Sequence, residues 1–260
     1  MSSDFSLNDK ILKKLDRQTQ NLIDREGLDR KTASEVFDKT TLIRIGNLIS
    51  NKFIDHFDFP ISTGKEAVVF RAVLQNKEFV AIKIYRTSNL TFKHIAKYID
   101  GDPRFNLNNK SRRDILYEWA KKEYKNLEKI NEAKVLAPRP IKRINNILIM
   151  QYIGSSDKPA PLLKDCVLKD PDKIFNTIIR FISLMYNKAG IVHADLSPYN
   201  ILIFKGKPYV IDVGQGILKN HPDSLTFLKR DIYNIVNYFK KYEIVPNGEE
   251  IFNKILTKSG

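Results

Sequence analysis

Two short segments in the last third of the 260-residue chain constrain its fold more than any other feature. The first, at 193–200, has the sequence HADLSPYN, and the second, at 212–214, is DVG. Strand-like runs on both sides of the turn sequence KGKP connect the two segments. This pattern predicts a β-hairpin that places Asn200 and Asp212 on adjacent strands.

The residue types in these segments suit the transfer of a phosphoryl group. Asp195 can accept or orient an attacking hydroxyl, while an amide oxygen from Asn200 and a second carboxylate from Asp212 can hold Mg²⁺ against a triphosphate. The spacing of Asp195 and Asn200 is that of the protein-kinase catalytic loop, H-R-D-L-x-x-x-N, and Asp212 matches the metal-binding D-F-G element. Each segment alone is a common turn or helix-cap sequence. Their combination predicts a site with Asp195 as the catalytic carboxylate and Asn200 and Asp212 as metal ligands.

An upstream strand and turn resemble the phosphate-binding half of such a site. The sequence VAIK at 80–83 matches the kinase strand whose lysine contacts the α- and β-phosphates, which assigns that role to Lys83. The turn before it, within 61–69, keeps only one glycine of the usual glycine-rich loop. The side chains around that glycine are therefore expected to contact phosphate together with backbone N–H groups. These nucleotide-binding residues are Ser62, Thr63, Gly64 and Lys65.

Helical periodicity selects the carboxylate that should pair with Lys83. Apolar residues recur at helical spacing from 114 to 130 and define one buried stripe. Glu123 lies on that stripe, whereas Glu118 and Glu128 lie off it. A buried carboxylate needs a partner because an unpaired buried charge is costly, so we expect Glu123 to pair with Lys83.

Taken together, the motifs resemble the RIO family of atypical serine/threonine protein kinases, and its Rio-one branch of the archaeal type in particular. The similarity runs in family order across most of the chain and includes the N-terminal sequence DRKT at 29–32. The other matching stretches are STGKEA at 62–67, IKIYRTS at 82–88, YIDGDPRF at 98–105, WAKKE at 119–123, 193–200 and IDVGQ at 211–215.

The resemblance implies a nucleotide, a metal and a partner. It implies binding of ATP with Mg²⁺, or with Mn²⁺ in its place, and it makes Asp212 a possible acceptor of the phosphoryl group. It implies that Met150 is the gatekeeper and that Tyr152 and Ile153 belong to the hinge that contacts adenine. Asp231 corresponds to the aspartate that anchors the catalytic-loop backbone. The implied partner is the small ribosomal subunit precursor, with its rRNA and proteins, during maturation.

Several departures from ordinary kinases accompany these matches. Ala194 replaces the arginine that receives an activation-loop phosphate, and no A-P-E sequence follows Asp212. The stretch between 216 and 227 is too short for a long activation segment with a peptide-binding shelf. Gly214 and Gly216 stand where the family usually has serine, which gives this loop more backbone freedom.

We expect an α+β, bilobal protein-kinase-like fold with a truncated C-lobe and a helical N-terminal extension. Helical patterns at about 7–27 and 40–57 place the extension at 1–58. The N-lobe, with its sheet and the Glu123 helix, should occupy 59–150. The C-lobe should occupy 151–260 and be mostly helical, with one helix at 174–186 and no strands except the catalytic hairpin.

Charge and composition limit the partners and the compartment. The 44 Lys and Arg residues against 30 Asp and Glu residues give a net charge of +14, which favours a polyanionic partner. Part of this positive charge lies at 86–113, which contains seven basic residues and two aspartates. A solvated connector would have the same composition. Cys166 is the only cysteine, so an intramolecular disulfide is impossible. The polar start and the lack of a long apolar run predict a cytoplasmic protein that does not span a membrane, and we expect a monomer.

Two other functions fit parts of the sequence. One is a kinase-fold scaffold that binds the ribosome with little catalysis, which the presence of Asp195, Asn200 and Asp212 disfavours. The other is a small-molecule kinase of the antibiotic-phosphotransferase type, which shares the H-x-D-x-x-x-x-N loop. The stretches that resemble the Rio-one branch disfavour this second alternative.

Overall fold

The computed structural model describes residues 38–86, 98, 102–105 and 111–257. Their residues divide into two compact units. The first contains 38–86, 111–120 and 141–152, and the second contains 98, 102–105, 121–140 and 153–257. The predicted domain limits at 58 and 150 stay predictions, because compact units need not be independently folding domains. The helix predicted near 7–27 and most of the basic stretch at 86–113 lie outside the described residues.

A five-stranded sheet with the order β1-β2-β3-β5-β4 forms the centre of the first unit. Its strands are β1 (Ile54–Thr63), β2 (Ala67–Leu74), β3 (Phe79–Tyr85), β4 (Pro140–Ile144) and β5 (Ile147–Gln151). The β1–β2, β2–β3 and β3–β5 pairs are antiparallel. Helix α3 (Lys39–Ser50) precedes the sheet, and the Asp38 carboxylate caps it by accepting a 2.7 Å hydrogen bond from Thr41 N.

The second predicted helix, at 40–57, is correct in its first part and wrong in its last. The helix ends at Ser50, and Ile54 already begins β1. Lys52 adopts a positive φ of 55°, which ends the helix and turns the chain into the strand. Apolar residues on both sides of this turn continued the helical spacing by coincidence, so periodicity alone could not locate the boundary.

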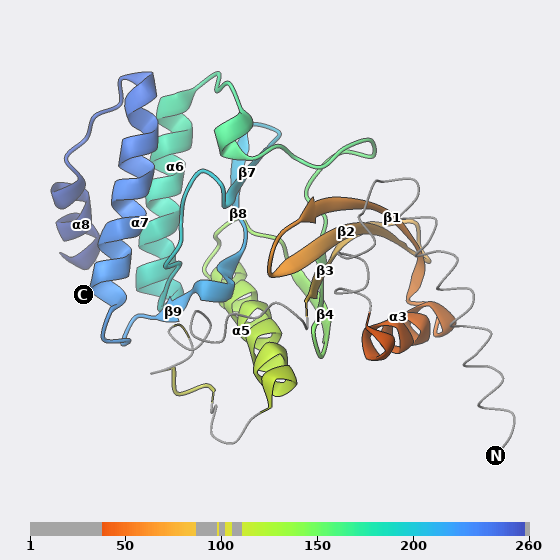
Figure 1. Ribbon diagram of the computed structural model, residues 1–260. Coiled ribbons are helices and arrows are strands. Elements are labelled where there is room, and N and C mark those ends of the chain that lie inside the picture. The colour runs from red at the N-terminus through yellow and green to blue at the C-terminus, as the bar shows by residue number, and fades with distance from the viewer. Residues whose placement is uncertain (1–37, 87–97, 99–101, 106–110, 258–260) are drawn as a thin grey trace, which may run out of the picture. The chain divides into compact units, whose positions relative to one another are not determined.

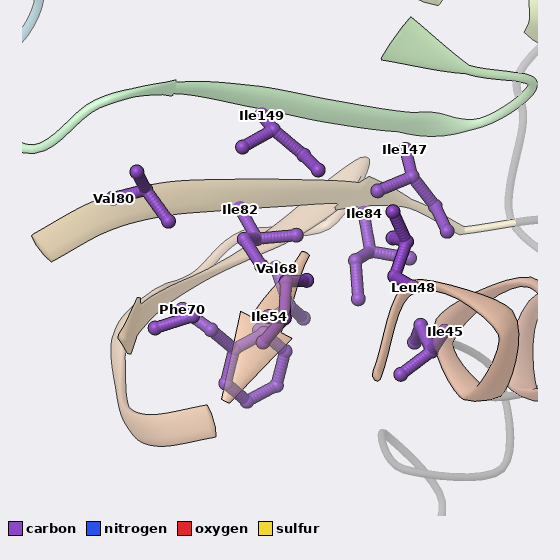
Figure 2. Close-up of a cluster of buried hydrophobic side chains, with 11 residues drawn as sticks. Ile45, Leu48, Ile54, Val68, Phe70, Val80, Ile82, Ile84, Ile147 and Ile149 are labelled. Carbon is purple, nitrogen blue, oxygen red and sulfur yellow. The ribbon is translucent and has the colours of Figure 1, made fainter. Parts of the chain in front are cut away.

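The core of the first unit lies between α3 and one face of the sheet. Ile45 and Leu48 of α3 pack with alternate residues of the strands, as Figure 2 shows. On β3 these residues are Val80, Ile82 and Ile84, all fully or almost fully buried. Because successive strand side chains point to opposite faces, Ala81 and Lys83 lie on the face away from this core.

The second unit is mainly helical, with two small sheets. Helix α7 contacts both α6 and α8 (Figure 1). Strand β6 pairs with β9, and β7 pairs with β8. The helices are α6 (Pro171–Leu184), which continues as a π-helical turn at Met185–Ala189, α7 (Ser224–Phe239) and α8 (Gly248–Thr257). The strands are β6 (Ile191–Val192), β7 (Ile201–Phe204), β8 (Lys207–Val210) and β9 (Ile217–Leu218). Helix α5 (Arg112–Glu132) contributes residues to both units.

These elements confirm the predicted catalytic hairpin and the helix at 174–186, and they correct one expectation. The second unit contains a further two-stranded sheet, β6–β9, in a region expected to have no strand besides the hairpin. Each of its strands has only two residues, too few to produce a recognisable alternation. Among the helices of the described residues, none combines the length and apolar character needed to cross a bilayer.

Candidate active site

Lys83 and Met150 share the sheet face opposite the apolar core. Lys83 pairs with Leu148 across the β3–β5 ladder, and Ala81 pairs with Met150. Directly opposed residues point to the same side of a sheet, so Met150 lies on the Lys83 face. The Lys83 side chain is largely buried, and its Nζ atom lies 5.1 Å from the centroid of the Tyr85 ring. This face is therefore the part of the first unit that the predicted nucleotide would contact.

The predicted phosphate loop is the exposed turn between β1 and β2. Ser62 and Thr63 end β1, and Gly64 and Lys65 form the turn, with all four residues exposed. Gly64 N donates a 3.0 Å hydrogen bond to Ala67 O, which closes the turn. An added Cβ at Gly64 would lie 3.2 Å from the same oxygen, a tight contact that glycine avoids. The contact of these residues with phosphate stays a prediction.

An arginine packs among the rings of Phe59, Phe79 and the predicted hinge residue Tyr152. Tyr152 and Ile153 are both buried. The Arg71 guanidinium lies 5.6 Å from the Tyr152 ring centroid and 4.4 Å from that of Phe79, and its Nε donates a 2.6 Å hydrogen bond to Asp58. It also lies 4.3 Å from the Phe59 ring. Sequence reasoning missed this cluster, because its members come from β1, β2, β3 and the end of β5 and have no common motif.

Glu123 is the buried carboxylate of α5, as predicted. It is 1% exposed, whereas Glu118 and Glu128 are partly exposed. Lys83 and Glu123 belong to different units, so their ion pair stays a prediction.

A buried carboxylate fixes the catalytic-loop backbone. Asp231 of α7 accepts hydrogen bonds from Ala194 N (2.8 Å) and Leu196 N (2.9 Å), while Asn234 Nδ2 donates to Leu196 O (3.1 Å) and Arg230 donates to Ala194 O. Ala194 has a φ of 65°, a left-handed conformation that is costly for alanine and needs such support. Burial raises the pKa of Asp231 to about 7, although the two N–H groups and Arg230 favour its charged form. The structure therefore contains the hydrogen bonds that the anchoring role implied by the resemblance requires.

The side chain of Asn200 is oriented by Asp195. Asn200 Nδ2 donates to Asp195 O at 2.8 Å and to Asp195 Oδ2 at 3.2 Å. This arrangement directs both hydrogens of the amide toward Asp195 and leaves Asn200 Oδ1 as an acceptor for another group. An amide oxygen is a ligand that Mg²⁺ prefers.

The backbone connects this loop to the segment that carries Asp212. Ile211 N donates to Asn200 O at 3.0 Å, and His193 Nε2 lies 3.0 Å from Ile211 O. A carbonyl can only accept, so His193 Nε2 carries the proton. Burial lowers the pKa of His193, which favours this neutral ring.

Asn200 and Asp212 flank the hairpin rather than lie on its strands, which corrects the predicted placement. Strand β7 begins at Ile201 and β8 ends at Val210. Asp212 has left-handed dihedral angles (φ 58°, ψ 56°), which cannot continue a β-ladder. Asp212 is an exposed residue, and its neighbour Ile211 is hydrogen-bonded to Asn200.

The donor groups available here fit Mg²⁺. Asn200 Oδ1 and the Asp212 carboxylate offer hard oxygen ligands. Within the part of the chain that the structure describes, no group of three or more His, Cys, Asp or Glu side chains forms a complete metal cage. Mg²⁺ commonly uses one or two carboxylates and completes its shell with water and substrate phosphates, so two protein ligands suffice.

Two side chains of α5 contact the backbone after Asp212, and sequence reasoning missed both of them. Lys122 and Asn126 are fully buried and donate hydrogen bonds to carbonyl oxygens within 213–216. A signal for them was present in the sequence. They lie three and seven residues after Trp119, beside the Trp119 edge of the stripe that selected Glu123.

We predict that Asp231→Asn lowers the free energy of unfolding by about 1–3 kcal/mol, because an amide can accept only through its oxygen and one buried backbone N–H would lose its acceptor. Urea denaturation at neutral pH measures this difference. The control is Asp223→Asn, which changes an exposed residue at the start of the same helix whose side chain makes no capping bond, and it should change stability by less than about 0.5 kcal/mol. Equal effects of the two substitutions would show that Asp231 does not anchor the loop.

Comparisons with known proteins agree with this geometry. The family model of the RIO domain matches residues 68–251. The RIO-type serine/threonine-protein kinase Rio1 of Methanocaldococcus jannaschii is 39% identical over 256 residues, which cover 97% of this chain and 88% of that protein. The Rio1 kinase of Thermoplasma acidophilum is 44% identical over 191 residues, covering 74% of this chain and 100% of that protein.

Two solved structures show the same fold. The Rio2 kinase of Chaetomium thermophilum has a TM-score of 0.64 at 16% identity, covering 97% of this chain and 86% of that one. An ADP/Mg²⁺-phosphoaspartate complex of Rio2 from the same organism has a TM-score of 0.65 at 19% identity, covering 82% of this chain and 65% of that one. The predicted α+β protein-kinase-like fold is thus confirmed. With a family model that spans most of the chain and Rio1 relatives at 39–44% identity, the chain belongs to the RIO family and is an atypical serine/threonine protein kinase of the Rio1 type.

Proposed function

We propose that this kinase uses ATP and Mg²⁺ and that Asp195 acts on the attacking group while Asn200 and Asp212 hold the metal ion. Lys83, paired with Glu123, contacts the α- and β-phosphates, and the exposed loop at 62–65 covers them. Met150, Tyr152 and Ile153 surround adenine. Mn²⁺ could replace Mg²⁺ at the same oxygen ligands.

One observation carries this proposal. Both hydrogen bonds from Asn200 Nδ2 go to Asp195, so the two residues form one unit in which the amide oxygen is left for a metal ion. The same contact restrains Asp195, which a catalytic carboxylate requires, because a misplaced general base loses much of its effect. A scaffold without catalysis would gain nothing from this arrangement.

Asp212 is also proposed to accept the phosphoryl group. An Asp212 oxygen attacks the γ-phosphorus of ATP, the bond between this phosphorus and the β–γ bridging oxygen breaks, and ADP leaves. Water then hydrolyses the acyl phosphate and restores the carboxylate. The exposure of the Asp212 side chain supports this role, as does the phosphoaspartate in the complex of the Chaetomium Rio2 kinase.

The proposed partner is a precursor of the small ribosomal subunit, met in the cytoplasm by a monomeric kinase. The net charge of +14 supports an RNA-containing partner. Arg112 and Arg113 at the start of α5 are exposed, and Arg113 Nη2 lies 4.0 Å from the Asp38 carboxylate. Arg104, which the sequence placed in the same basic stretch, is held by Asp102 and Asn126 and is not proposed as a phosphate contact.

For the catalytic carboxylate, Asp195→Ala should lower ATP turnover by about 10²–10⁴-fold, the usual effect of removing a positioned acid–base group, and leave Mg-ATP affinity within a few-fold. Steady-state ADP release and calorimetric titration measure the two quantities. The control is Asp157→Ala, at an exposed aspartate of the same unit, which should change neither ATP turnover nor Mg-ATP affinity. Wild-type turnover in the Asp195 variant would remove this residue from the mechanism.

For the acceptor role, Asp212→Asn should abolish a hydroxylamine-sensitive phosphoenzyme formed from γ-labelled ATP and raise the Mg²⁺ concentration needed for half-maximal turnover, because the metal loses a full negative charge. Asn200→Ala should raise that concentration less and retain the labelled species at saturating Mg²⁺. If the Asp212 variant still forms the labelled acyl phosphate, the acceptor lies elsewhere.

For the partner, replacing Arg112 and Arg113 together with Gln should weaken binding to purified small-subunit precursors. It should also flatten the dependence of log K on log salt by roughly 0.7–0.9 for each lost phosphate contact. The charge-matched control is the pair Lys169→Gln and Lys173→Gln, two exposed lysines near the start of α6. Identical slopes for the two double variants would place the RNA contact on another surface.

A further inference from the structure

The metal loop, defined here as residues 212–216, is held from one side by two residues of α5. Lys122 Nζ donates to Gly214 O at 3.0 Å and to Gly216 O at 2.6 Å. Asn126 Nδ2 donates to Val213 O at 2.8 Å and to Gly216 O at 2.9 Å. Three of the four carbonyl groups that follow Asp212 are therefore bound by side chains one helical turn apart.

A second pair of residues fixes the orientation of the Asn126 amide. Arg104 Nη1 donates to Asn126 Oδ1 at 3.0 Å, so the amide nitrogen must face the metal loop. Arg104 is itself held by the buried Asp102 through bonds of 2.9 Å from Nε and 2.7 Å from Nη2. The chain from Asp102 to the metal loop is thus a continuous set of charge-assisted and amide hydrogen bonds.

Glycine makes the close approach of Asn126 possible. A Cβ at Gly216 would lie 2.9 Å from Asn126 Nδ2 and 3.0 Å from Val213 O. Because Gly216 has no side chain, the Asn126 amide can approach this part of the loop.

Lys122 is a costly residue to bury for stability alone. Its side chain is completely buried, and it donates hydrogen bonds to the carbonyl groups of Gly214 and Gly216. Burial lowers the pKa of Lys122 to about 7, while the nearby Asp102 acts in the opposite direction and Arg104 reinforces the lowering. A folded-state pKa below the unfolded-state value means that protonation of this group opposes folding at neutral pH. An apolar side chain of similar volume commonly gives equal or greater stability at such a position.

We propose that Lys122 and Asn126 are positioning residues that fix the carbonyl groups of the metal loop and so present the Asp212 carboxylate to Mg²⁺. Arg104 supports them through the Asn126 amide. Without these donors the loop can rotate its peptide groups, and Asp212 leaves the left-handed conformation that directs its side chain outward. The proposal rests on the metal-binding role proposed for Asp212 and adds the residues that determine its geometry.

The test is the Mg²⁺ dependence of Lys122→Met, which keeps the volume of the side chain and removes its donors. The Mg²⁺ concentration for half-maximal ATP turnover should rise roughly 10–100-fold, the usual effect of losing a residue that orients a metal ligand. The KM for ATP at saturating Mg²⁺ should stay within about two-fold, and the thermal unfolding midpoint should not fall. The control is Lys125→Met, which removes a half-exposed lysine of the same helix whose Nζ is paired with Glu128 at 2.7 Å, and it should leave all three quantities unchanged.

Asn126→Ser provides a second variant if Lys122→Met does not fold, and its half-maximal Mg²⁺ concentration should rise in the same way. Metal binding is also measured without turnover, by electron paramagnetic resonance of Mn²⁺ in the presence of a non-hydrolysable ATP analogue, where both variants should bind Mn²⁺ more weakly than the wild type does.

The outcomes separate this inference from the proposed function. Wild-type protein without divalent-dependent turnover or Mn²⁺ binding would overturn the proposed function itself. A wild type that shows both, together with variants of unchanged metal affinity, would overturn the positioning role alone. Variants that lose stability in proportion to activity but keep their metal affinity would show that Lys122 and Asn126 serve only the fold.

Discussion

The buried carboxylate of Asp231 is the contact on which the geometry of the catalytic loop depends. It binds the N–H groups on both sides of Asp195, and in doing so it stabilises the left-handed backbone of Ala194. The metal loop follows the same principle, because Lys122 and Asn126 bind its carbonyl groups. In both loops a buried side chain holds the backbone that carries the functional side chain. Backbone contacts at Ile211 connect the two loops into one structure.

Local patterns predicted the parts of the site that depend on local structure. The VAIK strand, the hairpin and the buried Glu123 follow from alternation or helical spacing within a single element, and the structure contains each of them. The boundary of α3 and the sheet β6–β9 could not be predicted in the same way. A turn at Lys52 interrupts a helical pattern that apolar residues continue, and strands of two residues are shorter than any period.

Contacts between residues that are far apart in the sequence explain why other parts of the site were not predicted. Lys122 and Gly216 are separated by 94 positions, and no spacing rule connects a lysine on a helix with a carbonyl in a later loop. Lysine and arginine are ordinarily solvent-exposed, so residue type alone does not predict the burial of Lys122 or the internal hydrogen bonds of Arg104. The basic stretch at 86–113, which contains Arg104, shows why a count of charges does not identify a binding surface. A count of charges cannot separate an arginine that binds a partner from one that holds a loop, and only the bonds to Asp102 and Asn126 make that distinction.

We propose that one metal ion is bound between Asn200 and Asp212 while Lys83 and Glu123 hold the nucleotide in place. A crystal structure with Mn²⁺ and a non-hydrolysable ATP analogue tests it most directly, because anomalous scattering locates the metal ion without reference to the protein. We expect the anomalous peak within coordination distance of Asn200 Oδ1 and an Asp212 oxygen, with Lys83 paired to Glu123. A metal ion coordinated by neither residue, or Lys83 paired with Glu118, would contradict the account.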